Sequence, residues 1–233
     1  MNAIFNANEL ANKHPHENVL IVRNRFDYVA KRIGKRALAL SGNATAHDEI
    51  NPETQYADLR YEPDPARQEH RDRLGLLGRL AAHACVLEVY SDAPNGSEFR
   101  ACLSKHLAVW QQRVRDARGQ SREQGKQQSE DESTASFLWI IAAGAPNTLM
   151  QKLKLEPSPA WPPGIYLFGE DVLRVGIVVA SQLPRDRTTL LVRMMAAGPL
   201  LAATVPELAG LPPDAYERVV AEPILVLIRY GCV

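Results

Sequence analysis

Two acidic residues lie inside short apolar runs whose composition is typical of β-strands. Asp58 falls in the run 56–59, and Glu88 falls in the run 86–90. Burying a carboxylate is costly unless it is paired with a cation or bound to a metal. Two carboxylates on adjacent strands would also repel each other, and a divalent cation removes that repulsion. Such oxygen ligands suit Mg²⁺ or Mn²⁺, which can polarise a phosphoryl oxygen and generate hydroxide from water.

Each acid also has a simpler structural interpretation. Asp58 could accept a hydrogen bond from a backbone amide, or pair with an arginine such as Arg60 or Arg32. Glu88 could pair with Lys105 on the helix that is predicted to follow its strand. The pair is therefore a candidate metal site, and each of its members could instead be structural.

Two predicted strands must bring the acids together. The segment 55–61 shows some alternation of polar and apolar residues and ends at Pro63, whereas 84–90 is almost continuously apolar. Between them, 67–83 is predicted as one helix, charged at first and then leucine-rich on one face. The acids therefore depend on pairing between strands that a helix-sized insertion separates.

The second acid-bearing strand is followed by a predicted helix over 98–115. Asn95 and Glu98 have the spacing of a capping box, which marks a helix start. His106 falls on the apolar stripe of this helix, and we interpret it as a core histidine. The next segment, 116–136, is rich in Gln, Ser, Glu, Arg and Gly. We predict a disordered loop there, because it cannot bury enough apolar surface to repay its ordering.

The rest of the chain alternates between strand and helix signals. Further strands are predicted at 137–142, 165–168 and 172–179. Helices are predicted at 147–155, at 187–197 with Asp186 as N-cap, and from about Ala202 and about Asp214. This alternation predicts an α/β fold built of packed layers. We expect an N-terminal arm at 1–23, one α/β domain at 24–200, and a C-terminal helical segment at 201–233.

A helix predicted to begin after Asn24 carries a basic face. Lys31, Arg32, Lys35 and Arg36 include like-charge pairs four residues apart, each costing a few tenths of a kcal/mol, roughly. An anionic partner such as DNA would remove that cost. A solvated helix face is the alternative interpretation.

Composition limits the class of protein. Lysine plus arginine equals aspartate plus glutamate at 27 each, which argues against a polyanion-binding surface over the whole molecule but allows a local basic patch. The 3 cysteines are widely spaced without a CxxC pair, which argues against a zinc ribbon and suits a reducing compartment. The sequence shows neither a secretory signal nor an apolar run of bilayer-spanning length, so we expect a cytoplasmic protein.

The order of these motifs resembles the PD-(D/E)xK nuclease superfamily, and more closely its bacterial transposase-like branch, the recombination-promoting nucleases. That order is a helix, a strand with Asp, a strand with Glu-x-Lys or Glu-x-Gln, and a helix. Segments 57–59 and 87–91 resemble the two metal-site strands, and later segments resemble further core elements: 137–142, 172–179, 183–184 and 190–193. The resemblance runs over roughly 24–227. It implies a restriction-endonuclease-like layered fold, with a mixed central sheet flanked by helices, and magnesium-dependent hydrolysis of DNA phosphodiesters.

The resemblance also implies a ligand set. It makes Asp58 and Glu88 the ligands of Mg²⁺ or Mn²⁺. The family often has a further acid on or just after the first helix, and Asp27 or Glu49 could fill that place. Glu49 is slightly preferred, because Asp27 also has the position of a helix-capping acid.

The chain departs from the family pattern at three places. Tyr90 stands where the family has Lys or Gln, and a tyrosine carries no positive charge at neutral pH. Lys105 could supply the missing ammonium from the following helix. The insertion at 67–83 replaces a tight hairpin, and the family's charged helical tail is absent after 227, so we interpret the end as truncated. The alternative to an endonuclease is a catalytically inactive nuclease-fold protein with a binding or regulatory role.

Overall fold

A computed structural model describes residues 57–124, 136–196 and 198–221 of the 233-residue chain. All of them belong to one compact unit, Gln55–Val233. Within these three ranges, no helix combines the length and apolar character needed to cross a bilayer.

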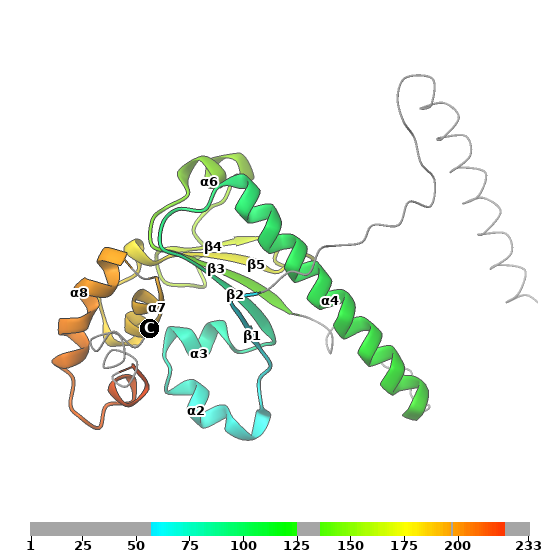
Figure 1. Ribbon diagram of the computed structural model, residues 1–233, viewed down its shortest axis with the longest axis horizontal. Coiled ribbons are helices and arrows are strands. Elements are labelled where there is room, and N and C mark those ends of the chain that lie inside the picture. The colour runs from blue at the N-terminus through cyan, green and yellow to red at the C-terminus, as the bar shows by residue number, and fades with distance from the viewer. Residues whose placement is uncertain (1–56, 125–135, 197, 222–233) are drawn as a thin grey trace, which may run out of the picture. The chain divides into compact units, whose positions relative to one another are not determined.

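A five-stranded mixed sheet forms the centre of this unit, in the order β1-β2-β3-β5-β4 (Figure 1). The strands are β1 (Leu59–Tyr61), β2 (Cys85–Tyr90), β3 (Phe137–Ala142), β4 (Ile165–Phe168) and β5 (Val175–Val179). The three central strands β2, β3 and β5 are parallel, and the edge strands β1 and β4 are antiparallel to their neighbours. Strands buried on both faces have nearly continuous apolar sequences, and these three segments follow that pattern apart from Glu88 in β2.

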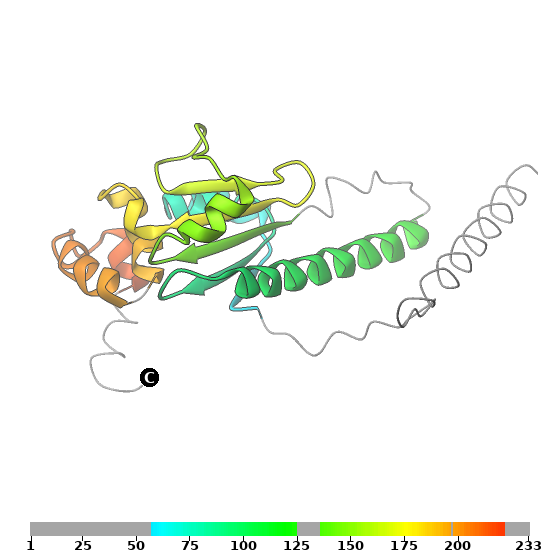
Figure 2. The ribbon, with the colours of Figure 1, turned by 90° about the horizontal axis from the view of Figure 1, so that it is seen from above.

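Helices cover both faces of the sheet, which gives a mixed α/β architecture (Figures 1 and 2). On one face lie α4 (Gly96–Gln124) and α6 (Asn147–Leu153). On the other lie α3 (Leu76–Leu80) and α7 (Leu190–Met195). Successive side chains of β2 point to alternate faces of the sheet. Val86 packs with Cys102 of α4, and Leu87 packs with Leu80 of α3. The even-numbered face of β2 is therefore the α4 face, and it carries Glu88.

The start of α4 is fixed by the predicted capping box. Asn95 Oδ1 accepts hydrogen bonds from the backbone N–H groups of Ser97 at 2.8 Å and Glu98 at 3.1 Å. Glu98 Oε2 in return accepts the N–H of Asn95 at 2.6 Å. These bonds satisfy backbone donors that a helix start leaves without partners. The predicted cap is confirmed.

The end of α4 corrects the prediction of a disordered loop over 116–136. The helix continues to Gln124, 29 residues from its start, and the part of the predicted loop at 125–135 lies outside the described residues. The segment 116–124 is polar, but apart from Gly119 it consists mostly of residues with good helix propensity. Propagating an existing helix costs little once packing has nucleated it, so low hydrophobicity alone did not end the helix.

The predicted single helix over 67–83 is also wrong. The chain forms a short 3₁₀ turn, η1 (Pro65–Arg67), then α2 (Gln68–Asp72), and then α3 after a break. Gly75 marks that break with φ of 59°, and a Cβ there would lie 2.5 Å from the carbonyl oxygen of Thr188. Glycine alone tolerates this left-handed backbone and close approach, so the chain turns and α3 packs beside α7.

Two later boundaries shift for local reasons. β5 begins at Val175 instead of 172, because residues 169–174 form a turn in which the N–H of Leu173 bonds to the carbonyl of Gly169 at 2.7 Å. The predicted helix 187–197 divides into η3 (Arg187–Thr189) and α7. Asp186 caps this start by accepting the N–H of Thr189, as predicted.

The remaining elements are η2 (Ala180–Gln182), α8 (Gly198–Ala209) and a helical turn at 216–221.

Trp139 joins the sheet to the α3 layer. Its indole N–H donates to the carbonyl of Leu80 at 2.8 Å, and the ring is 1% exposed. The ring lies over Gly176 of the neighbouring strand, where an added Cβ would come within 2.0 Å of it. The tryptophan is therefore a core residue, and Gly176 provides the space that it needs.

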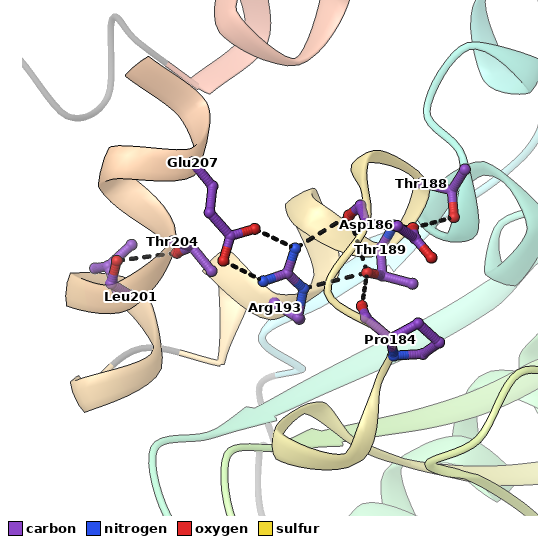
Figure 3. A network of polar contacts seen from close by, with 8 residues as sticks. All are labelled: Pro184, Asp186, Thr188, Thr189, Arg193, Leu201, Thr204 and Glu207. Atoms are coloured by element: carbon purple, nitrogen blue, oxygen red, sulfur yellow. Dashed lines mark hydrogen bonds and ion pairs between the residues drawn. The ribbon is translucent and has the colours of Figure 1, made fainter. Parts of the chain in front are cut away.

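A buried arginine ties α7 to α8 (Figure 3). Arg193 is 3% exposed, and its guanidinium donates to both carboxylate oxygens of Glu207 at 2.8 and 2.7 Å. It also donates to the carbonyl of Asp186 at 3.0 Å and to Thr189 Oγ1 at 3.1 Å. This arginine holds the pKa of Glu207 below its usual value. Four directed bonds from one rigid fork make Arg193 the polar anchor of the C-terminal helices.

We expect Arg193→Lys to lower the free energy of unfolding by about 2–3 kcal/mol, because a lysine cannot reproduce a buried bidentate fork. Urea denaturation measures this change. Arg67→Lys is the control, since the Arg67 side chain is 79% exposed and its single 3.4 Å contact with Asp64 survives as a simple ion pair. Equal losses in the two variants would contradict an anchoring role for Arg193.

Candidate functional site

Asp58 and Glu88 lie on the same face of the sheet. β1 pairs with β2 in an antiparallel register that sets Leu59 opposite Leu87. Continued by one residue, that register sets Asp58, directly before β1, opposite Glu88. Residues directly opposite in an antiparallel pair share a face. The structure thus brings the two predicted acids together beneath α4, at the edge of the sheet.

Glu88 is a buried carboxylate with one satisfied oxygen. The residue is 2% exposed, and its Oε2 accepts a hydrogen bond from Lys105 Nζ at 2.6 Å. Its Oε1 is also buried, and no described residue provides it with a partner. The predicted alternative for Glu88, an ion pair with Lys105, is confirmed, and it leaves half of the carboxylate unused.

Asp58 is exposed, and its side chain is fastened to the strand that carries Glu88. Its Oδ2 accepts the backbone N–H of Val89 at 2.8 Å. The backbone-amide interpretation of Asp58 is therefore confirmed, while Arg60 pairs instead with Glu62 at 3.4 Å. The bond orients the Asp58 carboxylate toward its neighbour, and its second oxygen has no hydrogen bond from a described residue.

Tyr90 and Cys102 form a hydrogen-bonded pair beside the two acids. The Tyr90 hydroxyl and Cys102 Sγ are 3.1 Å apart. Burial, the bond to Cys102 and the negative charges of Glu88 and Glu98 raise the pKa of Tyr90, so its hydroxyl stays neutral over the physiological range. Burial and the negative charges of Glu88 and Asp58 raise the pKa of Cys102, although the Tyr90 bond and Lys105 oppose them. The charges of both acids and of the lysine therefore act on the Cys102 thiol.

Four of the predicted site residues are thus neighbours in space: Asp58, Glu88, Tyr90 and Lys105. The proposed third acid, Glu49 or Asp27, lies outside the described residues, as does the basic face formed by Lys31, Arg32, Lys35 and Arg36. Among the residues that the structure describes, no group of three or more His, Cys, Asp or Glu side chains could hold a metal. The described part of the site therefore offers two carboxylates and one ammonium.

Cys102 is a site residue that no sequence motif indicated. It lies one helical turn before Lys105, on the flank of α4 that faces β2, and it is 0% exposed. Its signal was the spacing of three from Lys105, which places both side chains on one face of a helix. This spacing indicates a site only once the structure shows that this face of α4 contacts Glu88 and Tyr90.

His106 is the core histidine that the sequence predicted. It is 3% exposed, and because a carbonyl only accepts, its Nε2 must donate to the carbonyl of Leu173 at 2.9 Å. Burial lowers the pKa of His106, which keeps the ring neutral. The side chain points toward the β5 side of the sheet and is separate from the acids.

No protein-family model, curated protein or solved structure matches this chain. The site is therefore interpreted from its own donor atoms. Two carboxylates, one with a buried unpartnered oxygen, are ligands that a hard divalent cation prefers. The described residues supply two such ligands and no third, and Lys105 stands beside them as a competing or assisting positive charge.

We expect Lys105→Met to lower the free energy of unfolding by about 3 kcal/mol, because it leaves Glu88 buried without a cation. Adding Glu88→Gln should recover part of that loss, since a neutral amide no longer carries an uncompensated charge. Chemical denaturation of the single and double variants provides the test. Lys152→Met, at an exposed position of α6, is the control and should change stability by less than about 0.5 kcal/mol. A Lys105→Met loss no larger than the control would show that the ion pair is energetically unimportant.

The lowered pKa of His106 predicts a pH-dependent stability. Below about pH 6.5 the unfolded chain takes up a proton on this histidine that the folded protein resists, so the free energy of unfolding should fall as the pH drops below about 6.5. This fall begins above the range in which Glu207 and Glu217, with their lowered pKa values, are protonated. His106→Gln, which can still donate to Leu173, should flatten the slope. His83→Gln, at an exposed site, should not.

Proposed function

We propose that the chain is a metal-dependent phosphodiester hydrolase that acts on DNA, with a restriction-endonuclease-like fold of the transposase-like kind. One observation carries the proposal: Glu88 has a buried, unpartnered oxygen, its other oxygen is held by Lys105, and Asp58 lies directly opposite. A buried carboxylate oxygen without a partner costs about 1–3 kcal/mol or more. A site that retains this cost needs an explanation, and a ligand for that oxygen provides one.

Asp58 and Glu88 would hold Mg²⁺ or Mn²⁺, and Glu49 or Asp27 would add a third acid. When bound, the metal supplies Lewis-acid polarisation of the phosphoryl oxygen and lowers the pKa of bound water. The hydrogen bond from the Val89 N–H fixes one oxygen of Asp58, and the other oxygen would bind the metal. Strand pairing would then present the two proposed ligands from rigid elements without any loop movement.

Lys105 provides the positive charge that the second strand lacks. Its Nζ carries three donors, of which one is used at Glu88 Oε2. The remaining donors can orient a water molecule or bond to a phosphoryl oxygen as negative charge develops there. Tyr90 has a raised pKa and is bonded to Cys102, so it acts as a neutral positioning residue for this region.

The substrate class rests on charge. The chain has formal net charge +0, so attraction of a polyanion must come from a local group of cations. Lys31, Arg32, Lys35 and Arg36 form such a group in sequence, and we propose that they contact DNA phosphates. Phosphate contacts of this kind fix the position of the duplex without reading its sequence.

A second function has its own supporting observation. Lys105 lies 2.6 Å from Glu88, and Tyr90 stands where the resembled family has Lys or Gln. A site closed by its own ion pair would have no need of a metal. In that case the chain is a catalytically inactive nuclease-fold protein with a binding or regulatory role.

We expect the purified protein to nick supercoiled plasmid DNA with Mg²⁺ or Mn²⁺, and Asp58→Asn to reduce the rate by about 100-fold or more. Asparagine keeps an acceptor for the Val89 N–H, so the variant should fold normally. Glu156→Gln removes one exposed carboxylate elsewhere and should nick at the wild-type rate. Equal nicking by wild type and Asp58→Asn would refute the assignment.

Calorimetric titration with Mn²⁺ separates the two functions. The hydrolase should release or absorb heat on binding, and Glu88→Gln should abolish the signal. A wild-type protein that shows no heat and no cation-dependent thermal shift would leave only the inactive-fold function.

A further inference from the structure

A hollow of about 420 Å³ lies beside α4, away from the two acids. Its lining includes neither Asp58 nor Glu88. It is formed by α4, by the start of β3 and by the turn between β4 and β5. Ligand-binding pockets typically have volumes of about 300–1,000 Å³, with few polar groups set among apolar ones. The hollow therefore has the dimensions of a small-molecule site.

Two buried polar atoms in its lining have no partner among the described residues. They are His106 Nδ1 and Ser136 Oγ, and each of these residues is 3% exposed. Native proteins leave few buried polar atoms unpaired, and such atoms call for an explanation. Two of them in the lining of one hollow are independent indications of a missing hydrogen-bonding group.

The chemistry of these two atoms defines what they need. Because His106 Nε2 must carry the proton that it donates to the Leu173 carbonyl, Nδ1 of the neutral ring is an acceptor. Ser136 Oγ can donate a proton. A ligand with a donor for His106 Nδ1 and an acceptor for Ser136 Oγ satisfies both atoms.

The rim of the hollow is apolar and partly aromatic. Trp110 is 43% exposed, Leu107 is 37% exposed, and Val172 is 85% exposed. Exposed side chains of this kind change rotamer on the picosecond-to-nanosecond timescale. The indole face offers a stacking surface for a planar ring, an interaction that tolerates many ring types.

The charges at the hollow are balanced. Asp171 and Arg174 line it with one charge of each sign, which favours an uncharged ligand. Arg174 also has φ of 50°, a left-handed backbone that is strained for a non-glycine residue. Strain of this kind is concentrated at functional sites.

We propose that this hollow binds an uncharged planar heterocycle with adjacent N–H and C=O groups, the chemical class of the lactam nucleobases. The ring stacks on Trp110, the N–H donates to His106 Nδ1, and the carbonyl accepts from Ser136 Oγ. This site is separate from the proposed metal site and does not depend on the hydrolase function.

The test uses the full chain with two matched ligands, uracil and 1,3-dimethyluracil. Both have the same ring and carbonyl groups, but the second lacks the N–H donors. Saturation-transfer NMR detects contact, and chemical-shift titration gives the Kd. Uracil should bind at least about fivefold more tightly, because the methylated ring leaves His106 Nδ1 without its donor.

Three variants locate the binding. Trp110→Ala should weaken uracil binding by about tenfold through lost stacking, and His106→Leu by at least about fivefold, because leucine has no acceptor. Gln111→Ala, exposed on the same helix and outside the lining, is the control and should leave the Kd unchanged. Circular dichroism confirms that each variant is folded.

Three results would overturn the proposal. They are absence of saturation transfer to uracil at millimolar concentration, equal Kd values for uracil and its dimethyl analogue, and unchanged binding in folded Trp110→Ala. Asp58→Asn should bind uracil as the wild type does, so a failed hydrolase assignment and a failed nucleobase site give different results.

Discussion

The contact between Glu88 and Lys105 is the constraint on which the site depends. Glu88 is 2% exposed, and its Oε2 lies 2.6 Å from Lys105 Nζ. Lys105 comes from α4, the helix that follows the Glu88 strand. A carboxylate inside a parallel-sheet strand would otherwise be too costly to keep charged. The ion pair satisfies only one oxygen of Glu88, and the other oxygen has no partner among the described residues, on the sheet face that Asp58 shares.

Several local features converge to make that contact precise. The capping box at Asn95 fixes the start of α4, and therefore which helical residues lie over β2. Cys102 lies one helical turn before Lys105, and its thiol is hydrogen-bonded to Tyr90, two residues after Glu88. The Val89 amide then holds Asp58 in place from the edge strand. Each contact is local, and together they position β1, β2 and α4 around the ion pair.

The sequence predicted the elements whose signals are local. The strands at 137–142 and 165–168 have the predicted bounds, and the caps at Asn95 and Asp186 form as expected. It also offered Lys105 as the partner of Glu88.

The prediction of a single helix at 67–83 was wrong because Gly75 lies against the Thr188 backbone carbonyl, a contact that only tertiary packing provides. The loop at 116–136 was wrong over 116–124 because helix propagation does not require an apolar face. Cys102 was missed because its neighbours come from another strand.

The central claim is that the free oxygen of Glu88 and the carboxylate of Asp58 bind one divalent cation. An anomalous difference map from crystals grown with Mn²⁺ addresses it most directly. If both carboxylates bind the cation, the map shows a peak about 2.2 Å from Glu88 Oε1 and from an oxygen of Asp58, with Lys105 still beside the other Glu88 oxygen. A map without a peak there, in crystals where Lys105 contacts both Glu88 oxygens, would contradict this cation site.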